Sequence, residues 1–238
     1  GGETLTGNYL LSEMAGATLQ ILPSKDWLTK LNEVYQRLAS DFLTAGTPAL
    51  MIPTGGSDSL GIWGYIAAAE ELGKDMLAQN ISRALVATAT GSAGTQTGLT
   101  AGAAILDLPV NVRGYAVCDD SEWFNKRVRE DWAASVIRWP QLPKIQLLPV
   151  TVDHSVGPGY GYATKDVYRT IFELARLEGV ILDPVYTGKA FHGLITDIAS
   201  GELDAESDVI FLHTGGVFGA FSHEAPMREV TTNFSRKI

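Results

Sequence analysis

The sequence predicts an α/β protein with open, mainly parallel sheets flanked by helices. Short apolar segments of strand character alternate with segments whose apolar residues recur at helical spacing. Such alternation requires crossover connections, which make the strands parallel and cover both faces of the sheet. A Gly-, Ser- and Thr-rich loop at residues 90–95 joins an apolar strand directly to a helix. This arrangement predicts a ligand site at the carboxyl ends of the strands.

Composition narrows the class of protein further. The 238 residues carry a net charge of −9 and gather no stripe of Lys and Arg, which argues against a nucleic-acid partner. A single cysteine, Cys118, excludes an internal disulfide and favours a reducing compartment, so we expect a cytoplasmic protein. The sequence shows no apolar run long enough for a membrane span and no signal peptide. Because the chain opens at Gly1 without Met, we expect either processing or a longer polypeptide.

The predicted helices share apolar residues at every third or fourth position and stop near Gly or Pro. Gly16 ends the first helix, and Gly46 follows the second. The predicted helices cover residues 8–15, 26–45, 60–72, 95–106, 121–137, 164–178 and 190–199. The polar tail at 228–238 is expected to be loosely held.

The predicted strands are short apolar runs bounded by turn residues. Pro23 ends the first run, and Thr214-Gly215-Gly216 follows the last. The predicted strands cover residues 17–22, 49–52, 83–90, 110–117, 145–152 and 208–213.

The loop between the strand at 83–90 and the helix at 95–106 is the strongest candidate binding site. Backbone N–H groups at a helix start carry partial positive charge, glycines allow close approach and hydroxyls add donors, so the loop suits a phosphate. No Lys follows it as in a Walker loop, and the dinucleotide-binding pattern matches poorly. A plain tight turn with capping hydroxyls stays an alternative. The loop consists of Thr90, Gly91, Ser92, Ala93, Gly94 and Thr95.

Three further segments place polar side chains in loops. The turn after Pro184 projects Tyr186 and Thr187, and Tyr160 lies in a Gly-rich loop at 157–162 that suits closure over a substrate. A half-buried core tyrosine and a surface turn explain these two segments equally well. Thr214 follows the last strand at its carboxyl end. The 4 histidines show no metal-ligand spacing, so no metal is expected.

Six motifs, in this order, resemble one family. They are Gly-Asn-Tyr-Leu-Leu at 7–11, Pro-Thr-Gly-Gly-Ser at 53–57, Thr-Gly-Ser-Ala-Gly-Thr-Gln at 90–96, Gly-Pro-Gly-Tyr at 157–160, Asp-Pro-Val-Tyr-Thr-Gly-Lys at 183–189 and His-Thr-Gly-Gly at 213–216. Together they resemble the pyridoxal-phosphate-dependent D-cysteine desulfhydrase and 1-aminocyclopropane-1-carboxylate deaminase family. That family has the tryptophan synthase β-like fold (PLP fold type II). The resemblance covers nearly the whole chain.

The resemblance implies a role for each candidate residue. Residues 90–95 would hold the phosphate of pyridoxal 5'-phosphate, and Tyr160 and Tyr186 match active-site tyrosines that assist proton transfer or contact the substrate. Thr187 and Thr214 stand where the deaminases carry Glu and Leu and the desulfhydrases carry Thr. A Thr beside the pyridine nitrogen leaves that nitrogen largely unprotonated, which weakens the electron sink. This favours β-elimination from a small amino acid such as D-cysteine, with 1-aminocyclopropane-1-carboxylate and cysteate as alternative substrates. A homodimer is the family expectation.

The chain also departs from the family. The lysine that forms the Schiff base and the Ser-Asn segment that binds the substrate carboxylate lie upstream of the motif found here at 7–11, so roughly the first quarter to third of the family's chain is missing. No lysine of this sequence stands in that context, and Lys189 is expected to be structural. By resemblance, residues 1–59 are the remainder of a smaller mobile domain and residues 60–238 the larger cofactor-binding domain.

Three interpretations stay open at this point. The chain is part of a longer pyridoxal-phosphate lyase, or it is a short non-catalytic family member that binds pyridoxal phosphate or another phosphorylated ligand. An unrelated α/β protein with a phosphate site, such as a nucleotide-binding domain, is the third. The ordered motifs favour membership of the family over the last interpretation.

Overall fold

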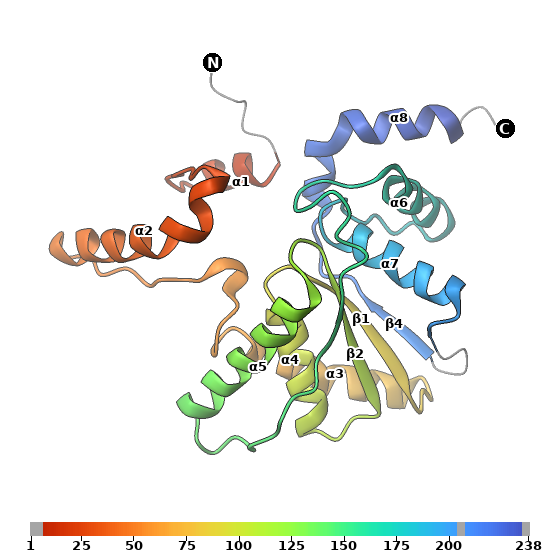
Figure 1. Cartoon of the computed structure of the whole chain (residues 1–238), viewed down its shortest axis with the longest axis horizontal. Helices are drawn as coiled ribbons and strands as arrows, with labels where there is room; N and C mark the ends of the chain where they lie inside the picture. The colour runs from red at the N-terminus through yellow and green to blue at the C-terminus, as the bar shows by residue number, and fades with distance from the viewer. Residues whose placement is uncertain (1–6, 204–207, 235–238) are drawn as a thin grey trace. The chain divides into compact units, whose positions relative to one another are not determined.

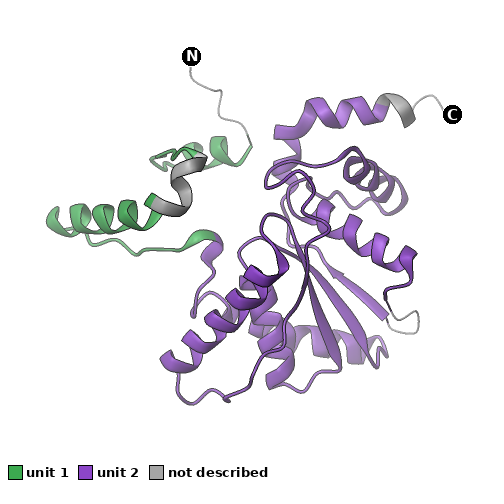
Figure 2. Ribbon diagram, in the orientation of Figure 1, with its two compact units in different colours: residues 1–54 green, residues 55–238 purple. Residues whose placement is uncertain are grey.

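A computed structural model describes residues 7–203 and 208–234 of the chain. The chain divides into two compact units, residues 1–54 and residues 55–238 (Figure 2). The mobility predicted for the first part of the chain and the cofactor-binding role predicted for the second stay predictions. Among the described helices, none combines the length and the apolar character that crossing a membrane requires.

The first unit contains helices where helices were predicted and no sheet among its described residues. Helix α1 spans Asn8–Met14 and helix α2 spans Ser24–Thr44, which confirms the predictions for 8–15 and 26–45. The strands predicted at 17–22 and 49–52 are wrong, because both segments are irregular. Leu50 and Ile52 are 86% and 64% exposed, so the second segment is not buried either. A strand needs a hydrogen-bonded neighbour, and neither apolar run has one in the described residues.

The second unit is built on a parallel sheet with the strand order β3-β2-β1-β4 (Figure 1). Strands β1 (Ala84–Thr90), β2 (Val110–Ala116) and β4 (Asp208–Leu212) confirm three predicted strands. Strand β3 covers only Val150–Val152, so the prediction of 145–152 is wrong over its first part. Pro149 has no N–H to donate to a ladder, and the strand therefore begins after it.

Helices cover both faces of this sheet (Figure 1). One face carries α3 (Trp63–Ala78), α4 (Gly94–Ile105) and α5 (Ser121–Arg138). The other carries α7 (Thr187–Ser200), on which α6 (Lys165–Glu178) packs, and α8 (Glu224–Phe234) packs on α6. Short 3-10 turns occupy Thr54–Gly56 and Val217–His223. The core lies on both faces of β1 and β2, whose side chains alternate between the two helix layers.

Two helix boundaries differ from the sequence prediction. Helix α7 begins at Thr187 instead of Ala190, because the Asp183 carboxylate accepts from backbone N–H groups before the helix. The polar tail predicted to be loose from Arg228 is helical as far as Phe234. Val230 is 4% exposed there, so one apolar side chain secures a segment whose polar composition suggested otherwise. Residues 235–238 lie outside the described part of the chain.

Helices α3 and α4 approach closely through glycine. A Cβ placed on Gly102 would lie 2.5 Å from Ala69 Cβ and 3.0 Å from Ile66 O, both on α3. One turn earlier, a Cβ on Gly98 would lie 2.5 Å from Ile62 O. These contacts fix α4, and the loop at its start, against the sheet.

We predict that Gly102→Ala lowers the free energy of unfolding by about 1–3 kcal/mol, because the added methyl group overpacks the α3–α4 contact. Gly64→Ala is the matched control. Gly64 also lies in a helix, but a Cβ there meets nothing within 4 Å, so this change is expected to raise the free energy by about 0.5 kcal/mol. Urea denaturation measures both, and equal effects of the two changes would contradict the prediction.

Candidate active site

The loop after β1 leads directly into the amino end of α4. Val117 N donates to Thr90 O (3.0 Å), which holds the loop against the end of β2. Ala93 takes a left-handed conformation (φ 72°), and the helix starts at Gly94. The first N–H groups of a helix have no intrahelical acceptor and attract negative charge. The turn therefore offers N–H donors at the carboxyl edge of the sheet, as the phosphate prediction requires.

Close packing explains the glycines of this loop. A Cβ on Gly91 would lie 2.8 Å from Cε1 of Tyr186. A Cβ on Gly94 would lie 2.4 Å from Ser57 Oγ. The loop is thus sandwiched between a tyrosine ring and a serine hydroxyl, and a larger residue at either position would displace one of them.

Ser57 is a site residue to which the sequence prediction assigned no role, although it lies in one of the six motifs. Its hydroxyl accepts from Gly94 N (3.1 Å) and shares a hydrogen bond with Ser92 Oγ (2.7 Å). Its backbone oxygen accepts from Arg127 Nη2 (3.0 Å) on α5. Ser57 is 3% exposed. The motif Pro-Thr-Gly-Gly-Ser at 53–57 was the available signal, although nothing in it shows which loop it touches.

The hydroxyls of the loop differ in whether they are used inside the protein or are available to a ligand. Thr90 is buried and donates to Gln96 Oε1 (2.9 Å), while Gln96 Nε2 donates to Val150 O (3.0 Å) and Thr151 Oγ1 (2.9 Å). This cluster joins β1 to β3 beneath the loop and uses the Thr90 hydroxyl internally. Ser92 and Thr95 are half-buried. Because Ser57 Oγ can donate to Ser92 Oγ, the Ser92 proton stays available, and the hydroxyls of Ser92 and Thr95 are the candidates to meet a ligand.

The structure brings the two predicted tyrosines together. The Tyr160 and Tyr186 hydroxyls share a hydrogen bond, and their rings meet edge to face with centroids 5.8 Å apart. Burial raises the pKa of Tyr186, and the hydrogen bond to Tyr160 raises it further, so this phenol keeps its proton. Because Tyr186 also packs on Gly91, the phosphate-suited loop and the tyrosine pair form one site.

Asp183 organises the turn that carries Tyr186 and Thr187. Its carboxylate accepts from the N–H groups of Val185, Tyr186 and Thr187, each at 2.8 Å, and from Thr187 Oγ1 (2.8 Å). Thr187 is fully buried, and its hydroxyl also accepts from Asp183 N (3.1 Å). The hydroxyl proton of Thr187 is thereby committed to Asp183.

Thr214 lies in the neighbouring turn and is exposed. A Cβ on Gly216 (φ 97°) would lie 2.6 Å from Asp183 Oδ1, so this turn packs directly on the same carboxylate. Asp183 therefore links the segments of Thr187 and Thr214, which the sequence predicted to flank one ligand.

Lys189 is 1% exposed and serves the protein itself. Its Nζ donates to the backbone oxygens of Val117 (3.2 Å), Val156 (2.8 Å) and Gly159 (2.7 Å). Burial lowers the pKa of its amine, and the Asp183 charge opposes this shift. The structural role predicted for Lys189 agrees with these contacts.

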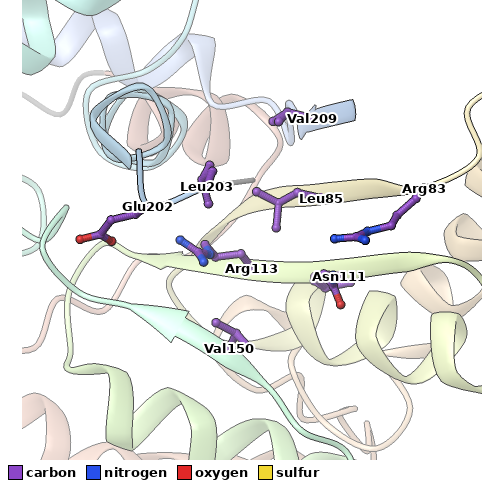
Figure 3. Close-up of a pocket in the computed structure, with 9 residues that line it drawn as sticks. Arg83, Leu85, Asn111, Arg113, Val150, Glu202, Leu203 and Val209 are labelled. Carbon is purple, nitrogen blue, oxygen red and sulfur yellow. The ribbon is translucent and has the colours of Figure 1, made fainter. Parts of the chain in front are cut away.

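A separate pocket of about 230 Å³ lies near the amino ends of the strands (Figure 3). Arg113, one of its residues, pairs with Asp197 (3.0 Å). The pocket includes neither a residue of the 90–95 loop nor either tyrosine of the pair. Its lining residues are Arg83, Leu85, Asn111, Val112, Arg113, Val150, Glu202, Leu203 and Val209.

The fold and the site together define a class: an α/β protein whose parallel sheet carries, at its carboxyl edge, a turn suited to a phosphate beside paired phenols. Residues 3–215 match the family described as "Pyridoxal-phosphate dependent enzyme", and the chain belongs to this family. Its fold is the tryptophan synthase β-like fold of PLP fold type II, and the cofactor of the family is pyridoxal 5'-phosphate. The predicted family is confirmed, which removes the interpretation as an unrelated nucleotide-binding domain.

Two relatives show which members of the family this chain is similar to. A bifunctional D-cysteine desulfhydrase/1-aminocyclopropane-1-carboxylate deaminase from Arabidopsis thaliana is 30% identical over 236 residues, which are 98% of this chain and 58% of the relative. A protein of Pyrococcus furiosus, which its name assigns provisionally as a 1-aminocyclopropane-1-carboxylate deaminase, is 35% identical over 223 residues. These cover 94% of this chain and 66% of that protein, so the chain spans about two thirds of this relative's length.

A solved structure shows the same fold. The crystal structure of an ACC deaminase homologue superimposes with a TM-score of 0.80 at 30% identity, over 97% of this chain and 68% of that one.

We predict that Asp183→Asn lowers the free energy of unfolding by about 2–3 kcal/mol, because a carboxamide cannot accept all the hydrogen bonds that the buried carboxylate accepts. Asp166→Asn is the matched control. Asp166 stands at the start of α6 with a side chain 64% exposed and an ion pair to Arg169, so this change is expected to cost less than about 1 kcal/mol. Thermal or urea unfolding compares the two, and an equally small cost for Asp183→Asn would refute its organising role.

We predict a pH dependence of stability from Asp131, which pairs with Arg127 (3.0 Å), the residue that donates to Ser57 O. Burial raises the pKa of Asp131 from 3.8 to about 6, against the opposing charge of Arg127. The folded chain thus binds this proton more tightly than the unfolded chain, and the stability gained is full below pH 3.8 and lost as the pH rises through about 6. Measured against Asp131→Asn, the free energy of unfolding of the wild type should fall across this window. A constant difference would contradict the prediction.

Proposed function

We propose that this chain forms part of a cytoplasmic, homodimeric pyridoxal-phosphate enzyme that eliminates the β-substituent of a small amino acid. The favoured substrate is D-cysteine, with pyruvate, ammonia and sulfide as products. One observation carries the proposal: the amino end of α4 and the hydrogen-bonded pair of Tyr160 and Tyr186 form one site, with the Tyr186 ring packed on Gly91. The name of the Arabidopsis relative includes this desulfhydrase activity.

The residues of the loop fit a phosphate. The first N–H groups of α4 supply donors with partial positive charge, and the hydroxyls of Ser92 and Thr95 are half-buried beside them. Ser57 fixes the turn by accepting from Gly94 N, so the remaining donors are held in place before the ligand arrives. In this proposal, Ser92, Thr95 and the loop backbone hold the cofactor phosphate.

Tyr186 suits the role of hydrogen-bond donor to the leaving group. Pyridoxal phosphate, when bound, supplies an electron sink for the charge that develops at Cα. The raised pKa of Tyr186 keeps its phenol protonated, and Tyr160 holds that hydroxyl in a fixed direction through their hydrogen bond. A protonated, oriented phenol can donate a hydrogen bond to a departing thiolate and so stabilise the charge that develops on its sulfur.

The state of Thr187 favours elimination over ring opening. By resemblance, Thr187 and Thr214 flank the pyridine ring. The Thr187 hydroxyl already donates to Asp183 Oδ1, so it has no proton to give to a pyridine nitrogen. An unprotonated pyridine is a weak electron sink, which suffices to expel a good leaving group such as a thiolate. Cysteate fits the same chemistry, whereas 1-aminocyclopropane-1-carboxylate demands a stronger sink.

We also propose that the lysine which carries the cofactor is not among these 238 residues. The Lys189 amine, beside the site, is bonded to backbone oxygens on all three of its donors. The other lysines with described side chains lie on exposed surface, namely Lys30, Lys74, Lys126, Lys144 and Lys165. This observation also supports the alternative that the chain is a short, non-catalytic family member that binds the cofactor or another phosphorylated ligand.

We predict that pyridoxal phosphate stabilises the chain against thermal unfolding and that pyridoxal, which lacks the phosphate, does not. Ser92→Ala and Thr95→Val should each weaken binding by about tenfold, because each removes a hydroxyl donor to a charged group. Thr196→Val is the matched control, because Thr196 is exposed on α7 and its hydroxyl donates to His192 O (2.8 Å) within the same helix. Fluorescence titration and thermal shift give the dissociation constants.

Two outcomes would contradict the proposal. Equal stabilisation by pyridoxal and pyridoxal phosphate would show that the loop holds no phosphate. Borohydride trapping of the cofactor on Lys189 would refute the absence of a carrier lysine, since that amine would then reach the aldehyde.

A further inference from the structure

The buried amine of Lys189 connects two separate parts of the site. One acceptor, Val117 O, lies at the end of β2, and the other two, Val156 O and Gly159 O, lie in the loop that carries Tyr160. An ammonium group has three N–H donors, and here each has an acceptor. The contacts join the backbone of the Tyr160 loop to the sheet edge, where Ser155 Oγ also donates to Ala116 O (2.9 Å).

A buried cation at this position requires an explanation beyond packing. Removing an ammonium from water costs several kcal/mol unless hydrogen bonds compensate, and an apolar side chain of similar volume would fill the space more favourably. The Tyr160 loop offers the reason. Gly157, Gly159 and Gly161 have φ values of 61°, 115° and 81°, conformations outside regular structure. Such a glycine-rich segment loses much conformational entropy when ordered, so it needs an external tether.

The tether reaches Tyr160 by a short route. Gly159, whose oxygen binds the Lys189 amine at 2.7 Å, directly precedes Tyr160, whose hydroxyl bonds to Tyr186. Tyr186 lies at the start of α7, and its oxygen accepts from Ala190 N (3.1 Å), next to Lys189. These contacts close a ring of five residues, namely Lys189, Gly159, Tyr160, Tyr186 and Ala190. Lys189 holds the peptide before Tyr160, and the helix of Lys189 carries Tyr186.

We propose that Lys189 is a positioning residue that sets Tyr160 against Tyr186 and so orients the phenol pair. The catalytic meaning of this inference rests on the proposed function, but the placement itself does not. A second contact acts on the far side of the loop, where His223 Nε2 donates to Gly161 O (2.8 Å). Lys189 thus acts on the residue before Tyr160 and His223 on the residue after it.

The test compares Lys189→Met with Lys189→Arg in the full chain without cofactor. Lys126→Met is the matched control, since the Lys126 side chain is 70% exposed on α5. Lys189→Met should free the phenol pair, so that about one more tyrosine ionises below pH 11 in an absorbance titration. Cleavage after Tyr160 by a protease specific for aromatic residues should rise about tenfold, because the loop opens more often. Cleavage after Phe42, in the first unit, should not change.

Rescue separates positioning from general stability. Lys189→Arg keeps a cation with N–H donors and should recover at least half of both effects. A Lys189→Met protein that folds with an unchanged tyrosine titration and cleavage rate overturns the proposal, and so does an arginine variant as disturbed as the methionine variant. If neither variant folds, hydrogen exchange of residues 156–162 in the wild type decides. Exchange at the rate of an unfolded peptide overturns the proposal, and at least tenfold protection supports it.

These measurements distinguish a failure of the positioning role of Lys189 from a failure of the proposed function. Changed tyrosine titration in a chain that ignores pyridoxal phosphate would leave the positioning role intact and refute the proposed function. Cofactor binding with unchanged tyrosine titration in Lys189→Met would do the opposite.

Discussion

Parallel pairing of β1 with β2 on one side and β4 on the other determines where the chemistry of this chain lies. Because all strands of the sheet run in one direction, the chain leaves each of them at the same edge. Thr90 pairs with Ala116 at that edge, and Gln96 then secures Thr90 to Thr151 beyond β2. The phosphate-suited loop, the Thr214 turn and the segments that lie against them are therefore neighbours, although they are widely separated in the sequence.

Two buried charges stabilise this edge, and both act mainly on backbone groups. Asp183 accepts from N–H groups of the turn that follows it, and Lys189 donates to carbonyl oxygens of β2 and the Tyr160 loop. In an interior of low dielectric such hydrogen bonds are strong, and the loss of one partner is costly. Irregular backbone, which has no ladder of its own, is thereby hydrogen-bonded to buried side chains at the sheet edge. Tyr160 and Tyr186 extend from this backbone, so the same hydrogen bonds position their side chains.

The sequence was most informative where local pattern and tertiary structure agree. Strand β1, its loop and α4 were predicted because apolar periodicity, glycines and hydroxyls all indicate one arrangement. The apolar runs at 17–22 and 49–52 failed because a strand depends on a neighbour that local pattern does not reveal. Ser57 was missed for a related reason, since its partner Ser92 lies 35 residues away. The hydrogen bond between Thr187 and Asp183 spans only four residues and was within reach of a search for helix caps.

The same contacts that order the site also limit its chemistry. The Thr187 hydroxyl donates a hydrogen bond to Asp183, and the Lys189 amine donates to three backbone oxygens. The Lys189 amine is buried with an acceptor on each of its donors, whereas carrying a cofactor aldehyde requires an amine that is free to reach the ligand. Neither residue can exchange its structural bonds for a ligand without releasing the loop it holds. The described residues are therefore equipped to hold a phosphate and to orient a phenol. We propose that the amine which moves the Cα proton comes from outside them.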